Sequence, residues 1–161
     1  MSPREQAAWA ALEQVPDPEL PALTLCDLGI VRAVRESGSA LEVVLTPTYS
    51  GCPATEFIQA SVHQALAQAG LHPVTVTQQL SPAWTSDWIS AEGTRKLLAY
   101  GIAPPGAAAA VDVIRIRPRQ SACPRCGSAN TERLSAFGST ACKALHRCLD
   151  CREPFEHFKP I

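Results

Sequence analysis

The sequence predicts an α+β protein with two domains, because apolar patterns, cysteine spacing and charge all divide the chain. In the first hundred or so residues the order strand, strand, helix, strand, helix predicts a small, mostly antiparallel sheet with two or three helices. Two Cys-x-x-Cys pairs near the end predict a compact ribbon. Residues 1–114 carry 5 Lys+Arg and 11 Asp+Glu, a net of −6, whereas residues 115–161 carry 9 and 4, a net of +5. We therefore expect domains at 1–117 and 118–161.

The first domain is predicted to begin with a helix over residues 4–14, with Trp9 and Leu12 on one face. Prolines then end this helix and make an acidic loop at 17–21. Two strand-like runs follow at 30–36 and 40–46, and the Ser-Gly-Ser sequence between them is typical of a hairpin turn.

The next elements are a helix over residues 53–69 and a strand over 73–80. Pro53 suits the first helical position, where no amide hydrogen is needed, and Gly70 is a suitable stop. The apolar stripe expected on the buried face of this helix comprises Phe57, Ile58, Val62 and Leu66.

An aromatic loop over 82–89 precedes a helix that Ser90 is expected to cap and that reaches Tyr100. Residues 104–110 are small and apolar and indicate a linker, and 111–117 has the pattern of a strand.

The four paired cysteines are the strongest functional signal in the chain. Cys123 and Cys126 form one pair and Cys148 and Cys151 the other, with 21 residues between the pairs. Each short turn presents two sulfurs on one side, and zinc holds four thiolates tetrahedrally at about 2.3 Å. The spacing therefore predicts a zinc-ribbon-like domain with these four residues as metal ligands. Disulfides would require an oxidising compartment, which the sequence does not indicate.

Cys142 lies between the two pairs, and a ribbon needs only four ligands. It could serve as a further ligand or as a buried thiol. His146 and His157 are also close in sequence, and a histidine ligand would make the identity of the metal harder to infer.

Cys52 is the second residue expected to carry chemistry. Gly51 and Pro53 fix the backbone on both sides. If Pro53 is the first helical residue, Cys52 is the N-cap, where the positive end of the helix dipole favours a reactive thiolate. The alternative is a buried cysteine that acts as a small apolar residue.

A single thiol cannot hold a metal alone, so acidic side chains would have to join Cys52. Asp27 and Glu19 are the weaker candidates, together with Asp17 of the same acidic loop. Asp27 is equally consistent with a turn or cap residue. For Cys26 a buried structural role is favoured over ligation.

Several classes of function are disfavoured. No apolar run reaches the length of a transmembrane helix, and the first residues lack the apolar core of a signal peptide, so a cytoplasmic protein without a membrane partner is expected. The chain lacks a glycine-rich dinucleotide loop, a P-loop and paired Glu-x-x-His motifs. We therefore expect no catalytic residues.

Seven motifs together resemble the PaaD family of bacterial phenylacetate degradation, and they cover nearly the whole chain. They are Asp17-Pro18-Glu19-Leu20-Pro21, Asp27-Leu28-Gly29-Ile30-Val31, Thr46-Pro47-Thr48-Tyr49-Ser50-Gly51-Cys52-Pro53, Pro82-Ala83-Trp84-Thr85-Ser86-Asp87-Trp88-Ile89, Tyr100-Gly101-Ile102-Ala103-Pro104-Pro105, Phe137-Gly138-Ser139-Thr140-Ala141-Cys142-Lys143-Ala144-Leu145 and Cys151-Arg152-Glu153-Pro154-Phe155. The first domain also resembles that of iron–sulfur maturation factors, in which the cysteine matching Cys52 is the functional thiol.

The resemblance implies a role in the phenylacetyl-CoA epoxidase system, which contains an iron–sulfur reductase subunit and a di-iron oxygenase subunit. The resemblance thus implies a maturation or scaffold factor rather than an enzyme. In such a factor Cys52 carries iron or a transient iron–sulfur cluster, the reductase is the main partner, and zinc supports the tail. Two alternatives stay open: an electron-transferring component of the epoxidase complex, and a nucleic-acid-binding zinc ribbon, which the modest basic charge disfavours. A homodimer is a further open question.

Overall fold

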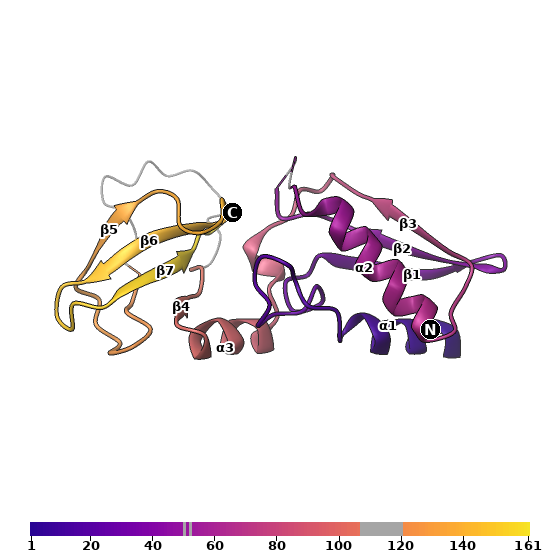
Figure 1. Ribbon diagram of the computed structural model, residues 1–161, viewed down its shortest axis with the longest axis horizontal. Coiled ribbons are helices and arrows are strands. Elements are labelled where there is room, and N and C mark those ends of the chain that lie inside the picture. The colour runs from indigo at the N-terminus through magenta and orange to yellow at the C-terminus, as the bar shows by residue number, and fades with distance from the viewer. Residues whose placement is uncertain (50, 52, 107–120) are drawn as a thin grey trace. The chain divides into compact units, whose positions relative to one another are not determined.

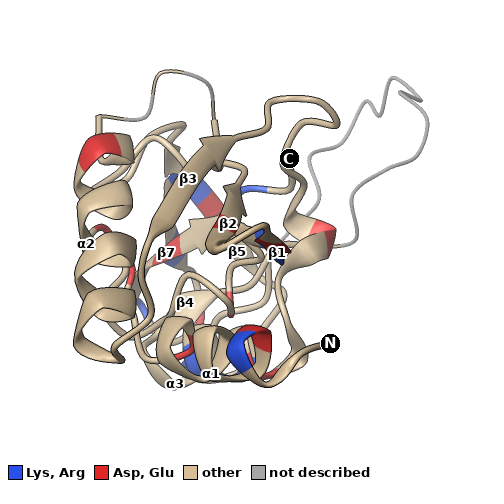
Figure 2. Ribbon diagram, turned by 90° about the vertical axis from the view of Figure 1, so that its right-hand side faces the viewer, with Lys and Arg blue, Asp and Glu red and all other residues tan. Residues whose placement is uncertain are grey.

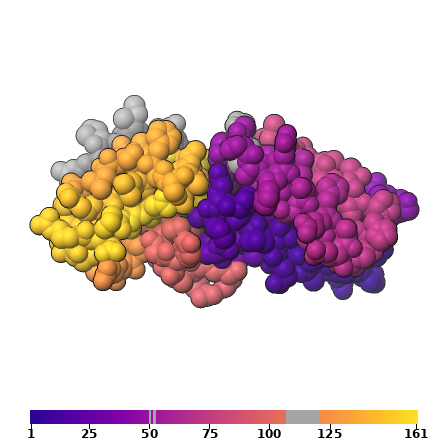
Figure 3. Space-filling model, in the orientation of Figure 1, coloured from indigo at the N-terminus to yellow at the C-terminus, as the bar shows by residue number. Residues whose placement is uncertain are grey.

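A computed structural model describes residues 1–49, 51, 53–106 and 121–161 of the chain. These residues form two compact units: Met1–Trp84 with Trp88–Gly93, called unit 1, and Thr85–Asp87 with Thr94–Ile161, called unit 2. In Figures 1 and 3 the colour of the chain runs from indigo at the N-terminus, in unit 1, to yellow at the C-terminus, in unit 2. The domain boundary predicted after residue 117 and the strand predicted over 111–117 lie outside the described residues.

Unit 1 contains a sheet of three strands in the order β1-β2-β3, namely β1 (Val31–Ser37), β2 (Ala40–Leu45) and β3 (Val74–Gln78). β1 and β2 form the predicted antiparallel hairpin. β3 pairs with β2 in parallel, since the chain crosses back over the sheet through a helix between them. All three predicted strands are confirmed, and one of the two pairings in this small sheet is parallel.

Two helices pack against this sheet, α1 (Pro3–Leu12) and α2 (Thr55–Gln68). The end view shows α1 below the sheet and α2 beside β3 (Figure 2). α1 starts with a capping box, in which the Ser2 hydroxyl accepts from the backbone of Glu5 and the Glu5 carboxylate accepts from Ser2 N–H.

The start of α2 differs from the prediction. The N-cap is Ala54, whose carbonyl accepts from Ile58 N–H at 2.8 Å, so Pro53 is not the first helical residue. Ile58 is buried with Val62 and Leu66 as predicted. The prediction that Phe57 is buried was wrong, and its side chain is 62% exposed. Successive side chains of a helix point about 100° apart, so Phe57 faces solvent while the next residue, Ile58, faces the core.

The core of unit 1 consists mainly of leucine and valine side chains from the helices, the strands and the loop before β1. The most deeply buried are Ala8, Leu12, Leu23, Leu25, Leu41, Val43, Val62 and Leu66, each 0% exposed. This core lies between α1, α2 and the sheet, as expected for an apolar face of each element.

The aromatic segment after β3 packs onto the turn that precedes β1. Trp84 is buried, and its indole N–H donates to the carbonyl of Leu28 at 2.8 Å. Gly29 has a φ of +66°, and a Cβ at this position would lie 2.6 Å from the carbonyl oxygen of Trp88. Glycine is therefore required here, both for the backbone angle and for the close approach.

A short helix, η1 (Ser86–Trp88), and then α3 (Ala91–Ala99) follow. The predicted cap of α3 is confirmed, since the Ser90 hydroxyl accepts from Gly93 N–H at 2.8 Å. No helix in the described part of the chain combines the length and apolarity needed to cross a membrane.

Unit 2 is built on a second sheet in the order β4-β7-β6-β5, with β4 (Ile102–Ala103), β5 (Thr131–Ser135), β6 (Lys143–Cys148) and β7 (Pro154–Phe158). β5, β6 and β7 pair antiparallel, and the two-residue β4 joins β7 in parallel. The apolar cluster of this unit is small and includes two of the paired cysteines; its members are Ala103, Cys123, Cys148 and Phe155.

Candidate metal centre and the Cys52 segment

The structure brings the four paired cysteines together. The Sγ atoms of Cys123, Cys126, Cys148 and Cys151 all lie within 4.8 Å of one another. Cys123 and Cys151 are 3.7 Å apart, and Cys126 and Cys148 are 3.6 Å apart. A tetrahedron with metal–sulfur bonds of about 2.3 Å has edges of about 3.8 Å, so the sulfurs fit a tetrahedral thiolate site for zinc or iron.

The two cysteine turns have the same backbone arrangement. Cys123 N–H donates to the carbonyl of Ser128 at 2.9 Å, and Cys148 N–H donates to that of Glu153 at 2.9 Å, five residues on in each case. The residue after the second cysteine has a positive φ in both turns, +75° at Gly127 and +66° at Arg152. Each turn thus presents its two sulfurs by the same local geometry.

Polar contacts connect the two turns. The Asp150 carboxylate of the second turn accepts from the Ser128 hydroxyl and, at 2.8 Å, from the side-chain amide of Asn130. These hydrogen bonds lower the pKa of Asp150. Arg125 and Glu153 form an ion pair of 2.5 Å between the turns. Sequence reasoning missed this set of contacts, because only the cysteine spacing indicated that the turns meet.

The surroundings of the clustered thiols act in opposite directions. Backbone hydrogen bonding from Cys151, and from Asp150, lowers the pKa of the Cys148 thiol to about 7. At Cys126 a backbone hydrogen bond with Ser128 is outweighed by desolvation and by hydrogen bonds with the other three sulfurs, which raise the pKa of that thiol to about 12. Cys123 and Cys148 are buried, whereas Cys126 and Cys151 are exposed. The site therefore has a buried half and a half that faces solvent.

The two histidines of the ribbon lie apart from the sulfur cluster. His146 stacks on Phe155 with ring centroids 5.6 Å apart, and its ring meets that of His157 edge-on at 5.2 Å. Burial lowers the pKa of His157 to about 4, and the neighbouring His146 acts in the same direction. In the described residues the group of sulfur ligands includes neither histidine.

Cys142 is also outside the four-sulfur group. It is buried at the start of the β6 region, and its Sγ lies 3.1 Å from the Thr140 hydroxyl. Its carbonyl accepts from Lys159 N–H at 2.9 Å. The geometry fits the buried-thiol alternative for this residue.

Cys52 lies outside the described residues, so its predicted thiolate environment stays a prediction. The specific argument from the helix end was wrong, because Ala54 occupies the N-cap of α2. What remains is the motif itself, between the end of β2 and the start of α2.

Asp17 and Asp27, two of the acidic residues suggested to join Cys52, accept hydrogen bonds from nearby backbone groups. Asp27 accepts from Thr24 N–H at 2.9 Å and contacts the Ser90 hydroxyl at 3.4 Å. Asp17 accepts from the backbone of Glu19 at 2.9 Å and of Leu20 at 2.8 Å. These contacts match the turn-and-cap alternative for Asp27.

Cys26 is poorly suited to ligation. Burial, with the nearby carboxylates of Glu13 and Asp27, raises the pKa of its thiol to about 12. The thiol therefore stays protonated at neutral pH, as expected for a structural role.

Comparison with known proteins agrees with this two-part layout. Residues 5–77 match the family model described as "Iron-sulfur cluster assembly protein", and residues 110–159 match "PaaD zinc beta ribbon domain". Over 159 residues the chain is 48% identical to a protein of Escherichia coli (strain K12) that is named as a putative component of 1,2-phenylacetyl-CoA epoxidase, covering 99% of this chain and 94% of that protein. The chain belongs to the PaaD family. The resemblance inferred from the motifs is thus confirmed.

Solved structures resemble a part of this PaaD-family chain. A domain of unknown function, DUF59, from Bacillus anthracis superposes with a TM-score of 0.55 at 27% identity, covering 58% of this chain and 91% of that chain. A conserved hypothetical protein from Thermotoga maritima gives a TM-score of 0.50 at 27% identity, covering 58% and 92%. The predicted α+β class with a C-terminal ribbon is confirmed.

Proposed function

We propose that this PaaD-family protein is an accessory factor of aerobic phenylacetate degradation that helps to assemble the iron–sulfur or iron centre of a phenylacetyl-CoA epoxidase. The observation that carries the proposal is the 48% identity, over nearly the whole chain, to a protein named as a component of that enzyme. The match of residues 5–77 to iron–sulfur cluster assembly proteins supports maturation rather than catalysis.

In this proposal Cys52 binds the iron or cluster that is the cargo. It lies within the matched segment, and a cysteine thiolate is a suitable donor for iron and for iron–sulfur clusters. Asp27 and Glu19 are weaker candidates for the same site, because the Asp27 carboxylate already has hydrogen-bond partners in its turn.

The sulfur site of unit 2 has a structural role in the proposal. Zinc fits the arrangement of Cys123, Cys126, Cys148 and Cys151. The bound metal would stabilise the fold of unit 2, whose apolar cluster is too small to do so alone. The chain's own hydrogen bonds, above all those to Asp150, hold the two turns in position around it.

The proposal predicts that Cys52→Ser leaves the fold and the zinc content unchanged but lowers the cluster content of the epoxidase's iron–sulfur reductase. The measurement is iron and acid-labile sulfide in the reductase purified anaerobically from cells that produce either form of this protein. Cys26→Ser is the matched control, because that thiol is also in the first domain and is not expected to act. Full cluster content with Cys52→Ser would refute the proposal.

An electron-transferring role is favoured by one observation, the exposure of Cys126 and Cys151 at the edge of the tetrahedral site. Iron in such a site is coloured and redox-active, whereas zinc is neither. Metal analysis and an absorption spectrum of the anaerobically purified protein distinguish the two, and a colourless zinc protein removes this alternative.

A further inference from the structure

Two histidines of the ribbon are neighbours on one face of its sheet. In the register of β6 and β7, His146 is paired with Phe155, and Ala144 is paired with His157. Side chains two residues apart on a strand point to the same face, so His146 and His157 are diagonal neighbours on that face. Their ring centroids lie 5.2 Å apart, and the ring planes are 78° from parallel.

One ring nitrogen of this pair is buried without a partner. His146 is 6% exposed, and among the described residues its Nδ1 has no hydrogen-bond partner. Buried polar atoms are nearly always hydrogen-bonded, to protein or to ordered water. The unpaired nitrogen therefore points to a ligand or a water molecule at this position.

The other histidine borders a cavity. His157 lines a space of about 270 Å³ within unit 2, together with residues 104–106, 121–122 and Pro160. Of the described residues around this space, only His157 and Ser121 have polar side chains, and the others are proline, glycine and alanine. A cavity of this size has room for an ion with several water molecules, each of which takes about 30 Å³ in the liquid.

The separation of the two rings fits imidazoles that share one metal ion. With metal–nitrogen bonds of about 2.0–2.1 Å and a tetrahedral angle, the centroids of two such rings lie roughly 5 Å apart. The observed separation is 5.2 Å. Burial also lowers the pKa of His157 to about 4, so its ring is neutral at neutral pH, and the neutral ring is the form that binds metal.

The neutral rings favour a cation over an anion as the ligand. Each neutral imidazole has one nitrogen with a free lone pair, whereas an anion is bound best by protonated rings. Arg133 is paired with His146 in the register of β5 and β6 and acts on it electrostatically. Its positive charge opposes a bound cation and favours a bound anion, so its removal should affect the two kinds of ligand in opposite directions.

We propose that His146 and His157 form a second metal site, which binds a divalent transition ion such as Ni²⁺, Co²⁺ or Zn²⁺. Imidazole nitrogens suit these ions, whereas Mg²⁺ and Ca²⁺ prefer oxygen ligands. Two protein ligands leave coordination positions open to water or to a small ligand, so the ion is exchangeable. The inference does not depend on the proposed function, which assigns metal only to cysteines and acidic residues.

The test adds Ni²⁺ to the full chain after one equivalent of zinc has filled the sulfur site. Titration calorimetry should show one further equivalent of bound metal, and a zinc-sensitive dye should show that no zinc is released. Paramagnetic Ni²⁺ should broaden the imidazole NMR signals of His146 and His157 and spare those of His63 and His72. His157→Gln should weaken Ni²⁺ binding at least about tenfold, the lower limit of the loss even for groups that only support a metal ligand.

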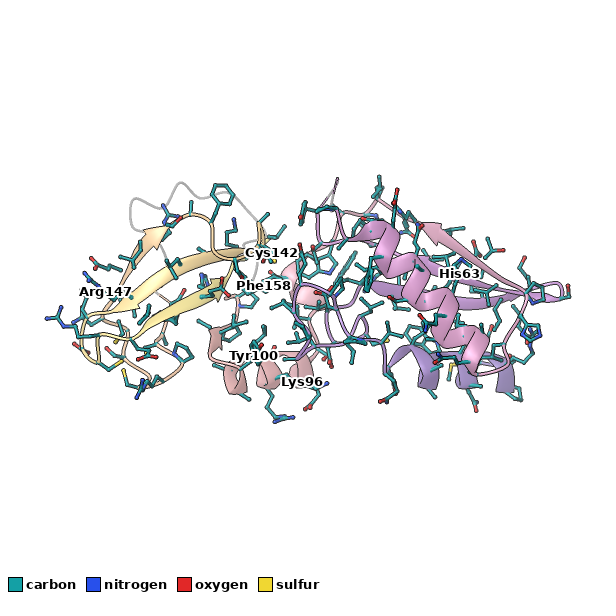
Figure 4. All side chains as sticks on the ribbon, viewed as in Figure 1. His63, Lys96, Tyr100, Cys142, Arg147 and Phe158 are labelled. Carbon is teal, nitrogen blue, oxygen red and sulfur yellow. The ribbon has the colours of Figure 1, made fainter. Side chains whose placement is uncertain are left out.

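The chain offers two matched comparisons. His63 is exposed on α2 in unit 1, where Figure 4 labels it, so His63→Gln should keep the wild-type affinity within about twofold. Arg133→Gln should tighten Ni²⁺ binding at least about twofold, because it removes a positive charge beside His146.

Three outcomes overturn the inference: no further equivalent of metal, equal losses in His157→Gln and His63→Gln, or weaker binding in Arg133→Gln. The first would leave water as the partner of the buried His146 nitrogen, and the third would indicate a site for an anion. Each variant must retain its zinc content and circular dichroism. If His157→Gln does not, the NMR broadening in the wild type decides, since signals of His146 and His157 that stay sharp would reject the site.

Discussion

The two units achieve stability in different ways. Unit 1 buries a continuous apolar core of leucine, valine and isoleucine side chains between two helices and a sheet. The apolar cluster of unit 2 contains two of the four clustered cysteines, Cys123 and Cys148. If these cysteines hold a metal as proposed, the same residues serve as core and as ligands, and we expect the fold of unit 2 to depend on its metal.

Loss of the metal should destabilise unit 2 more than any other change, and it tests whether the fold of this unit depends on metal. Cys148→Ser, or removal of the metal with a chelator, should unfold β5, β6 and β7, because metal binding in small domains contributes about 10 kcal/mol or more to folding. Hydrogen exchange should show lost protection in these strands and retained protection in β2 and α2. Cys142→Ser is the control and should keep the metal. Retained protection in the metal-free ribbon would show that its apolar cluster suffices.

The second effect is confined to unit 1. Leu25→Ala should lower the free energy of unfolding of this unit by about 3 kcal/mol, because Leu25 is 0% exposed and its truncation leaves a cavity. Zinc content should not change. Phe57→Ala removes a larger side chain that is 62% exposed and should cost less than about 0.5 kcal/mol. Denaturant titration measures both, and equal losses would contradict the assignment of core and surface.

Acid should weaken unit 2 through His157. Its pKa of about 4 lies below the usual 6.5 of histidine, so the unfolded chain binds the proton more readily than the folded one. Stability is therefore complete above pH 6.5 and is lost as the pH falls toward 4. After discounting for partial exposure the loss is about 1–2 kcal/mol.

His157→Gln should show a smaller fall in the thermal midpoint between neutral and mildly acidic pH than the wild type. Excess zinc must be present, since protons also compete with metal for the thiolates. An identical fall in both proteins would show that the thiolates alone account for the acid sensitivity.

Substitutions at the positive-φ residues of the two cysteine turns should change the stability of unit 2 least, and in opposite directions. Arg152 has a positive φ of 66° where the first turn has Gly127, and a side chain in this region costs about 1 kcal/mol. Arg152→Gly should raise the thermal midpoint of unit 2, and Gly127→Ala should lower it by a similar amount. A lower midpoint with Arg152→Gly would mean that the arginine side chain makes a compensating contact.

Much of the fold could be predicted from local patterns. The hairpin, the third strand, the Ser90 cap and the ribbon follow from alternation, turn residues and cysteine spacing, which act over a few residues. The helix predicted between β2 and β3 allows these strands to pair in parallel, but no local pattern specifies which strand β3 lies beside. The start of α2 was misplaced because proline is compatible with the turn before a helix as well as with its first residue.

The candidate sites were predictable to different degrees. Four thiols at fixed spacing predict a metal site by themselves, and the structure brings those sulfurs together. The partners of Asp150, by contrast, lie in the other turn, so only the three-dimensional arrangement reveals them. The exposure of Phe137 could not be predicted either, because the sequence alone does not show whether a fold buries a phenylalanine.

Because the two cysteine turns share one geometry, each could be redesigned as a unit. Each turn is a six-residue module, 123–128 or 148–153, closed by the same hydrogen bond and carrying half of the ligand set. Modules of this kind are interchangeable in principle, so a copy of the first could be transplanted into the place of the second. Asp150 and Glu153 would both have to be retained, because Asp150 accepts from Ser128 and Asn130 and Glu153 pairs with Arg125. Two short peptides of one geometry, joined by two carboxylate contacts, are thus enough to bring four sulfurs together in this ribbon.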